Sequence, residues 1–374
     1  MNRTGQFYSG AVSIFIVVFT ALLMTIVTVS FARLMLREQQ RASSSDLSQS
    51  AYDAALAGVE DAKRALTMYA QRTGADPVPN FGDCSTVPTM VGATLLSDDE
   101  GGGALVGDRE LQQAYTCVVV ELDTDDYRAS LTADRSQLIP LRGVGDFDRV
   151  KIEWFSRDTD LSGSTEADIP PNTSSVELTP STSWPTDRPP VMEAQLIQSA
   201  NTFTIDQFDA EAGSSGESNA NTLFLYPIER LTDPTLRFLD DERINVGAEP
   251  TEVRCVSSVA DREYACSATI RLPAPVGGGT RSNAHLRLSP RYNNAESRIS
   301  LYKGSSLVQF DGVQPVVDST GRANDLFRRV SARVETGARS VAYPDAAVDV
   351  TGNFCKTFRI TDSVEHYSYG GCRP

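Results

Sequence analysis

The N-terminal part of the chain contains a long run without charge. No charged residue occurs from Thr4 to Ala32, and between Ala11 and Ala32 the only polar residues are Ser and Thr. A bilayer core needs roughly 20 apolar helical residues. Lipid offers the backbone no hydrogen-bond partners, so a segment that crosses it must be helical. The run therefore predicts a membrane-spanning helix over residues 11–32.

A cleaved secretory signal is the alternative interpretation of this run. The apolar region of such a signal normally has about 7 to 15 residues, and this run is longer. One feature still fits a signal, because Ser30, Phe31 and Ala32 form a small-x-small pattern. A mature chain that starts at Arg33 would support this alternative.

The helix is predicted to continue beyond the apolar run. Neither Gly nor Pro occurs from Ala11 to Ala57, whereas Gly74 and Pro77 are expected to end the helix. Small and apolar residues recur three or four positions apart, which is helical spacing, at Leu47, Ala51, Ala54, Gly58, Ala62 and Ala65. One helix over residues 11–72 would be roughly 90 Å long. Its narrow face of small residues should let another element approach the backbone closely.

A rival interpretation of this second part, a coiled coil, is less favoured. A signalling-type coiled coil needs sustained Leu or Ile at the a and d positions, and the Ala-rich face lacks them. Gly58 costs about 1 kcal/mol in the middle of a helix. A close crossing of another element at Gly58 could offset that cost.

Composition and cysteines indicate the class and the compartment of the body. The net charge of −15 argues against nucleic-acid binding, which needs clustered Lys and Arg. An even number of cysteines beyond the membrane segment suggests disulfides in an oxidising compartment. Proximity in the chain favours three pairs, although other pairings are open: Cys84 with Cys117, Cys255 with Cys266, and Cys355 with Cys372.

Two signals in the sequence predict opposite orientations for the membrane-spanning helix. Disulfides place the body on the extracytoplasmic side. Arg33, Arg37 and Arg41 follow the apolar run, whereas only Arg3 precedes it, and this distribution alone favours the reverse orientation. We give the cysteines more weight and expect an extracytoplasmic body.

The rest of the chain is predicted to be rich in β-strands, so the fold class is α+β with long loops. We expect a first β-rich region at 73–156, a Ser/Thr/Pro-rich linker or loop at 157–190 and a second β-rich region at 191–374. Asp318–Asp325 is predicted to be a polar loop. Alternating or β-branched runs predict strands at 113–122, 127–141, 149–156, 191–198, 202–208, 222–227, 253–257, 264–272, 285–288, 298–302, 307–310, 326–334, 347–350 and 354–360.

No motif predicts an enzyme. The nucleophile elbow, the phosphate-binding loop and the zinc-protease helix motif are absent from the sequence, which contains only two His. His285 and His366 are each expected to be structural or exposed. The sequence therefore predicts no catalytic site.

Calcium is the only cofactor that the sequence suggests. Asp158 and Asp160 resemble the start of a calcium loop, but Ile169 occupies the twelfth position, where a bidentate Glu is needed. Asp123 and Asp125 form a second acidic turn. Solvated turn acids are the favoured interpretation of both segments.

A short leader, MNRTGQFYSG, ends at Gly10 and precedes the long apolar helix. The block from Ala54 to Ala62 has the pattern A-x-x-A-G-x-E-x-A. In these features the first part of the chain resembles the minor pilins of the PilX class, whose signature has this pattern, and, more distantly, the pseudopilins of type II secretion systems. The resemblance is specific over residues 1–70 and only architectural beyond them. Cys355 to Cys372 resembles the C-terminal disulfide loop of many pilins.

The resemblance implies a processing site. A prepilin peptidase would cut after Gly10, so that residues 1–10 are a leader and Ala11 becomes the mature N-terminus; Gly5 is a rival site. The helix would anchor the chain in the cytoplasmic membrane and later pack in a fibre core. The fibre-core helix would include Phe15, Ala51, Ala54, Gly58, Glu60 and Ala62.

One departure from the family concerns Phe15. Typical pilins have Glu at this fifth mature position, where it holds the N-terminal amine of a neighbouring subunit. A subunit without it resembles the tip subunit of a pseudopilus, so we expect this chain to prime or cap a fibre.

The implied partners are the major pilin and other minor pilins, the prepilin peptidase, the inner-membrane assembly platform and a host or surface receptor. Cell adhesion and twitching motility would be the functions supported. The alternatives are a tip pseudopilin of a type II secretion system and a membrane-anchored extracellular binding or enzymatic domain.

Overall fold

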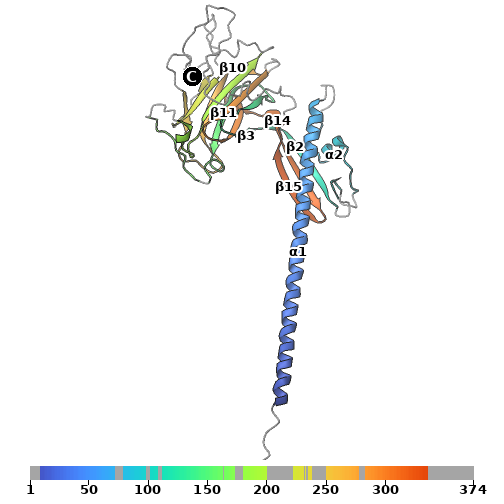
Figure 1. Cartoon of the computed structure of the whole chain (residues 1–374). Coiled ribbons are helices and arrows are strands. Elements are labelled where there is room, and N and C mark those ends of the chain that lie inside the picture. Colours follow the sequence, from blue (N-terminus) through green and yellow to red (C-terminus); the bar gives the residue numbers. More distant parts are fainter. Residues whose placement is uncertain are drawn as a thin grey trace, which may run out of the picture. The chain divides into compact units, whose positions relative to one another are not determined.

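The computed structural model has an α+β fold, with one long N-terminal helix and a large β-rich body (Figure 1). The described residues are 9–71, 79–97, 102–107, 112–162, 164–172, 180–199, 222–230, 232, 235–237, 250–277 and 283–335. They fall into two compact units. Unit 1 comprises the described residues of Met1–Thr124 and Asp311–Arg339, and unit 2 comprises those of Asp125–Phe310.

Helix α1 of unit 1 runs without interruption from Ser9 to Gln71, a length of 63 residues. Its continuity is explained by the absence of Gly and Pro from Ala11 to Ala57. Gly58 lies inside the helix and does not break it. The helix starts and ends within two residues of the bounds that the sequence predicts.

A small four-stranded sheet in unit 1 packs on the C-terminal part of α1. The strand order is β1-β2-β14-β15, in which β1 pairs antiparallel with β2, and β14 pairs antiparallel with β15. A short helix, α2, precedes β1 and also packs on α1. The elements are α2 (Thr86–Val91), β1 (Ala104–Leu105), β2 (Ala114–Thr124), β14 (Phe310–Ala323) and β15 (Leu326–Arg333).

The predicted polar loop at Asp318–Asp325 is wrong. Strand β14 continues to Ala323, and only Asn324 and Asp325 form the turn that leads into β15. Asn324 has a φ of 53°, a left-handed conformation that Asn tolerates. Small polar residues suit a strand here because one face of β14 lies directly against a helix, where larger side chains would not fit.

Unit 2 is built from strands. Within the described residues, eleven strands form one sheet in the order β13-β12-β5-β10-β9-β7-β6-β11-β4, with β3 added beside β12 and β8 beside β10. Its elements are β3 (Tyr127–Leu131), β4 (Gln137–Leu141), β5 (Phe147–Ser156), η2 (Ser181–Ser183), β6 (Val191–Ser199), β7 (Thr222–Glu229), β8 (Thr235–Arg237), β9 (Thr251–Cys255), β10 (Tyr264–Val276), β11 (Asn283–Arg291), β12 (Ala295–Lys303) and β13 (Ser306–Val308).

Most predicted strands of the body are present. The segment 127–141 divides into β3 and β4, because Asp134 has a φ of 60° in the turn between them. Strands β9 and β10 pair antiparallel, with Cys255 directly opposite Cys266. The predicted strands at 202–208, 347–350 and 354–360 lie outside the described residues.

The segment 157–190 packs on unit 2 where it is described. Trp184 is buried, and its ring stacks on Tyr292 with 4.1 Å between ring centroids. Trp154 is fully buried in β5 and donates a hydrogen bond from Nε1 to the carbonyl oxygen of Pro190. Both tryptophans therefore contribute to packing.

The division into units does not follow the order of the chain. β2 belongs to unit 1, whereas β3 to β13 belong to unit 2, and β14 and β15 return to unit 1. Unit 2 is thus inserted between β2 and β14 of the smaller sheet. Regions 73–156 and 191–374 therefore each contribute strands to both units.

Candidate functional site

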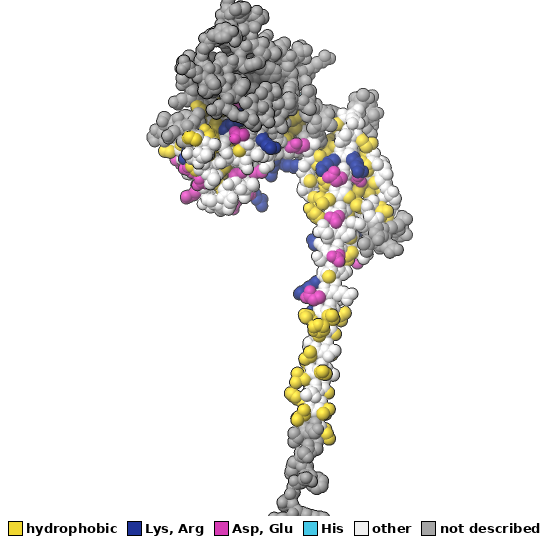
Figure 2. Space-filling model, in the orientation of Figure 1, with side chains coloured by type: hydrophobic (Ala, Val, Ile, Leu, Met, Phe, Trp, Pro, Cys, Tyr) yellow, Lys and Arg dark blue, Asp and Glu magenta, His cyan; other side chains and the backbone are white. Residues whose placement is uncertain are grey.

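The candidate site is α1, whose two halves have different surroundings. We call residues 14–36 the free half and residues 47–66 the packed half. Every residue of the free half is exposed, and Phe15 is 79% accessible. Figure 2 shows apolar side chains along this part of the helix and charged side chains beyond it. α1 is long and apolar enough to cross a membrane, by length and composition.

The packed half buries a stripe of small side chains against its own unit. Its inaccessible residues are Ala51, Ala54, Ala55, Ala62 and Ala65, joined by Gly58, Val59 and Leu66. This spacing of three and four places them on one face of the helix. The small-residue face therefore binds the sheet of the same chain.

Two glycines allow the helix and the sheet to approach. A Cβ atom at Gly58 would lie 2.3 Å from Ser319 Oγ and 2.8 Å from Val118 Cγ2. A Cβ atom at Gly321 of β14 would lie 2.2 Å from the backbone of both Ala51 and Ala55. Real Cβ contacts are not this short, so both positions require glycine as long as the helix lies this close to β14.

Hydrogen bonds also hold the packed half of the helix against the sheet. Gln113 Nε2 donates to the carbonyl oxygen of Ser50 at 3.1 Å. The hydroxyl of Tyr115 donates to Asp61 Oδ2 at 2.8 Å. Burial and the neighbouring Asp61 carboxylate raise the pKa of Tyr115 above its ordinary value, so this phenol remains a donor at physiological pH.

An apolar cluster lies under the packed half. Val59 and Leu66 of α1 belong to a buried cluster with Val118 and Val120 of β2 and Val317 of β14. Val118 and Val120 alternate along β2 and so point to the same face. This cluster supplies the hydrophobic burial that the alanines on the helix cannot, because an alanine removes little apolar area from water.

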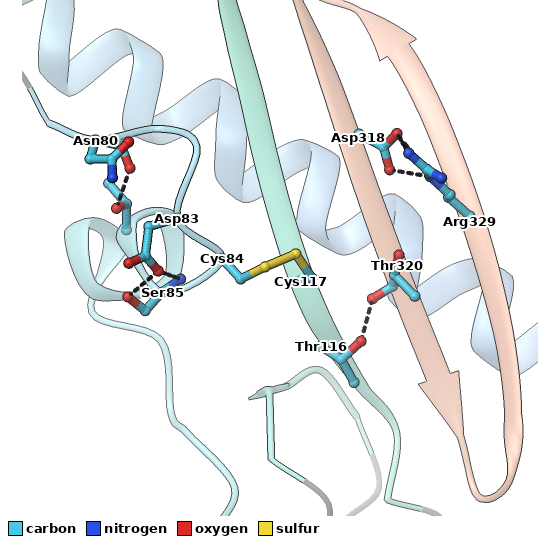
Figure 3. Close-up of a disulfide and its surroundings, with 10 residues drawn as sticks. Asn80, Asp83, Cys84, Ser85, Thr116, Cys117, Asp318, Thr320 and Arg329 are labelled. Atoms are coloured by element: carbon cyan, nitrogen blue, oxygen red, sulfur yellow. Dashed lines mark hydrogen bonds and ion pairs between the residues drawn. A yellow bond between two sulfur atoms is a disulfide. The ribbon is translucent and has the colours of Figure 1, made fainter.

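A disulfide joins the segment of α2 to the sheet. Cys84 and Cys117 of β2 are bonded, and their Cα atoms are 4.5 Å apart (Figure 3). The turn before α2 is held by Asp83, whose carboxylate accepts hydrogen bonds from the backbone N–H and hydroxyl of Ser85. These hydrogen bonds lower the pKa of Asp83.

The cysteine pairs in the described residues are the two that proximity predicts. Cys84 bonds Cys117, and Cys255 bonds Cys266. Cys355 and Cys372 lie outside the described residues.

The other residues implied by the resemblance lie in different environments. The backbone of Gly10 and Ala11 belongs to the first turn of α1. Phe15 is exposed in the free half, whereas Ala51, Ala54, Gly58 and Ala62 face the sheet. Glu60 lies on the opposite, exposed side of the packed half and pairs with Lys63 at 2.6 Å.

The acidic residues suggested for calcium are not gathered into one site. Asp160 Oδ2 accepts hydrogen bonds from the backbone N–H of Ser156 at 2.6 Å and of Glu296 at 3.0 Å. Asp125 accepts a hydrogen bond from Gln309. Among the described residues, no group of three or more His, Cys, Asp or Glu side chains is placed to hold a metal ion. Asp158 and Asp123 lie in the turn after β5 and at the end of β2.

Strands β14 and β15 pack on α1, and the sequence pattern did not predict them as its partners. Ser319 and Gly321 face the helix, and the side chain of Arg328 in β15 donates to Ser48 Oγ at 2.6 and 2.8 Å. The signal that could have found them is the alternation of Val317, Ser319, Gly321 and Ala323, which gives one face of small residues to match the small face of α1.

Comparison with known proteins gives no match: no family model, no curated protein and no solved structure is similar to this chain.

Proposed function

We propose that this chain is a non-enzymatic minor pilin of the PilX class, a single-pass protein of the cytoplasmic membrane that primes or caps a type IV pilus. The observation that carries the proposal is the division of one continuous helix. The packed half is held by a small sheet of its own unit, and the free half, residues 14–36, presents large apolar side chains all round.

The free half needs a covering that the described residues do not supply. Burying a Leu, Ile, Val or Phe side chain is worth about 1.5 to 3 kcal/mol relative to water. Lipid tails can cover this surface first, and the apolar helices of other subunits can replace them in a fibre. Lipid is as apolar as Leu, so this exchange has little hydrophobic cost.

Two features support a position at the end of the fibre. Phe15 stands where the family carries the Glu that holds the amine of a neighbouring subunit. Unit 2 is a large insertion between β2 and β14, and a shaft would have to accommodate its bulk between neighbours on every side. A priming or capping subunit has neighbours on one side only.

Two further functions share some of these features. A tip pseudopilin of a type II secretion system would use the same helix, and deletion would then abolish secretion rather than piliation. A membrane-anchored extracellular binding domain would keep α1 in lipid permanently. Adhesion and twitching motility would follow from a pilus function through a surface receptor.

Intact-mass and N-terminal analysis of the protein from membranes tests the proposal, with and without a prepilin peptidase. We expect a peptidase-dependent start at Ala11. An unchanged start at Met1 would support the permanently anchored domain, and a start at Arg33 would mean that residues 11–32 are a discarded signal. Either result would overturn the pilin proposal.

A further inference from the structure

The large sheet of unit 2 carries three arginines in a row on one face. Arg149 of β5 lies directly opposite Arg271 of β10, which lies directly opposite Arg237 of β8. Neighbouring strands are about 4.8 Å apart, so the row extends about 10 Å across the sheet. Val150 and Ile270, the adjacent residues in β5 and β10, are buried. Because side chains alternate along a strand, the three arginines point away from the core. We call them the arginine row.

The positive charge of the arginine row is not compensated. Arg237 and Arg271 are exposed, and neither pairs with an acidic side chain in the part of the chain that the structure describes. Arg149 Nε lies 3.8 Å from Asp148 Oδ1, which is too long for a hydrogen bond. Like charges directly opposite each other in a sheet destabilise it. The row therefore costs the folded protein stability, and packing does not explain it.

The next row on the same face carries a lysine and two hydroxyl groups. Two residues along each strand from the arginine row, Lys151 lies opposite Thr269, and Thr269 lies opposite Thr235. Lys151 Nζ pairs with Glu153 at 2.9 Å, and Glu153 also accepts a hydrogen bond from Arg298 at 2.8 Å. Because Glu153 is shared by two cations, it leaves the arginine row uncompensated. The face therefore presents hydroxyl donors beside an excess of positive charge.

The acidic character of the whole chain does not prevent an anion from binding here. The net charge of the chain is −15. Salt screens exposed charges over about 8 Å at physiological ionic strength, so distant carboxylates act weakly on this face. No run of Lys and Arg in the sequence marks the site, because strand pairing brings its arginines together from three separate strands.

The geometry of the face indicates which kind of anion fits it. A small anion would contact one or two guanidinium groups of the row, whereas a chain of anionic units could contact all three. Single-stranded nucleic acid is held largely by bases that stack on successive aromatic side chains, and the strand residue beyond Arg149 provides one, Tyr302. The disulfides Cys84–Cys117 and Cys255–Cys266 indicate an oxidising compartment outside the cytoplasm, where surface polysaccharides are found.

We propose that the arginine row binds an acidic polysaccharide whose sugar units carry carboxylates. Guanidinium groups form paired hydrogen bonds with carboxylate oxygens. The hydroxyl groups of Thr235 and Thr269 can donate to and accept from the sugar hydroxyls beside those carboxylates. The inference goes beyond the proposed pilus function, because the row belongs to unit 2 and would act in the same way on a permanently anchored domain.

The test measures binding of the full chain, in phosphatidylcholine nanodiscs, to immobilised polygalacturonate and to neutral dextran by biolayer interferometry. We expect binding to polygalacturonate that weakens as salt rises, and no binding to dextran. Arg237→Gln and Arg271→Gln should each weaken binding about fivefold, the upper range for an exposed ion pair. Both variants should unfold at the temperature of the parent or above it, because they remove repulsion between like charges. A structural role of the arginines predicts a lower unfolding temperature instead.

Arg135→Gln is the matched control, because Arg135 is exposed in the turn after β3. Strand β3 pairs with the first residues of β12, whereas the arginine row lies beside the last ones. Equal weakening by Arg135→Gln and Arg271→Gln would mean diffuse surface charge and overturn the proposal. Equally tight binding of polyglutamate or single-stranded DNA would overturn a polysaccharide as the ligand. Absence of binding to polygalacturonate would overturn this inference alone, since the pilus proposal depends on the N-terminus of the mature chain.

Discussion

The free and packed halves of α1 share one helical backbone but follow opposite rules of burial. The free half carries the most apolar side chains of the helix, and they are exposed; Phe15 is 79% accessible and Met24 76%. The packed half carries alanines and a glycine, which are inaccessible. If hydrophobicity alone decided burial, the free half would be buried and the packed half exposed. Side-chain size decides it, because only a face of small residues allows β14 to approach the helix backbone.

The difference also separates two kinds of stability. The packed half depends on specific contacts with one sheet, so small changes in shape should affect it. The free half depends on an apolar environment of no fixed shape, so it should tolerate changes in shape and respond to charge. Variants that affect one half and leave the other unchanged can therefore test the comparison.

The largest effect is expected on removal of the disulfide beside the packed half. Cys84→Ser/Cys117→Ser should lower the free energy of unfolding of unit 1 by about 3 to 4 kcal/mol, given the sequence separation of 33 between the cysteines. Thermal unfolding under non-reducing conditions measures it. Cys255→Ser/Cys266→Ser is the control and should destabilise unit 2 instead. If the first variant left unit 1 unchanged, the disulfide would have no part in holding the sheet.

A charge in the free half is expected to have the next largest effect. Leu22→Lys should make membrane insertion less favourable by about 3 kcal/mol, because Leu22 lies near the centre of the predicted span. The stability of unit 1 should not change. Membrane fractionation measures the insertion, with Leu56→Lys on the exposed side of the packed half as the control. Equal membrane fractions for Leu22→Lys and the parent would contradict a spanning free half.

A methyl group between helix and sheet should act only on the packed half. Gly321→Ala places a Cβ against the backbone of Ala51 and Ala55, and overpacking of this kind costs about 1 to 3 kcal/mol. Gly145→Ala is the matched control, because a Cβ there meets nothing within 4 Å. Chemical denaturation of both variants gives the comparison. A Gly321→Ala protein as stable as the control would mean that α1 does not lie this close to β14.

The smallest effect concerns the pH dependence of the stability of unit 2, which contains neither half of α1. Burial raises the pKa of Asp160 to about 6, although two backbone N–H groups favour its ionised form. The folded state therefore binds this proton more tightly than the unfolded state, and the contribution of Asp160 to stability is lost as pH rises through about 6.

Asp160→Asn keeps an acceptor oxygen and removes the titration. Its unfolding free energy should change less steeply than that of the parent between about pH 6 and pH 4. Denaturation series at several pH values measure the two slopes, and identical slopes would show that Asp160 titrates normally.

Much of the architecture could be predicted from the sequence, because it depends on local patterns. The bounds of α1 follow from the positions of Gly and Pro, and the small face at Ala51, Ala54 and Gly58 predicted a closely packed partner. The partner itself could not be predicted. Strand β14 is more than 250 positions further along the chain, and its small polar residues resemble a loop until they are seen against the helix.

The division into two units could not be predicted from local sequence patterns either. Whether a strand joins the small sheet or the large one depends on pairing across the inserted unit, and no pattern within β2 or β3 records it. Arg328 illustrates the same limit, because its place beside Ser48 depends on the register of β15 with β14.

Hydrogen–deuterium exchange on the full chain in nanodiscs tests the division of α1 most directly. Amides of residues 14–32 and 47–66 should both be protected in the parent protein. In Gly321→Ala, protection should fall in 47–66 and persist in 14–32, because lipid and not the sheet covers the first segment. Rapid exchange of 14–32 in the parent, or loss of protection in both segments together, would contradict the account.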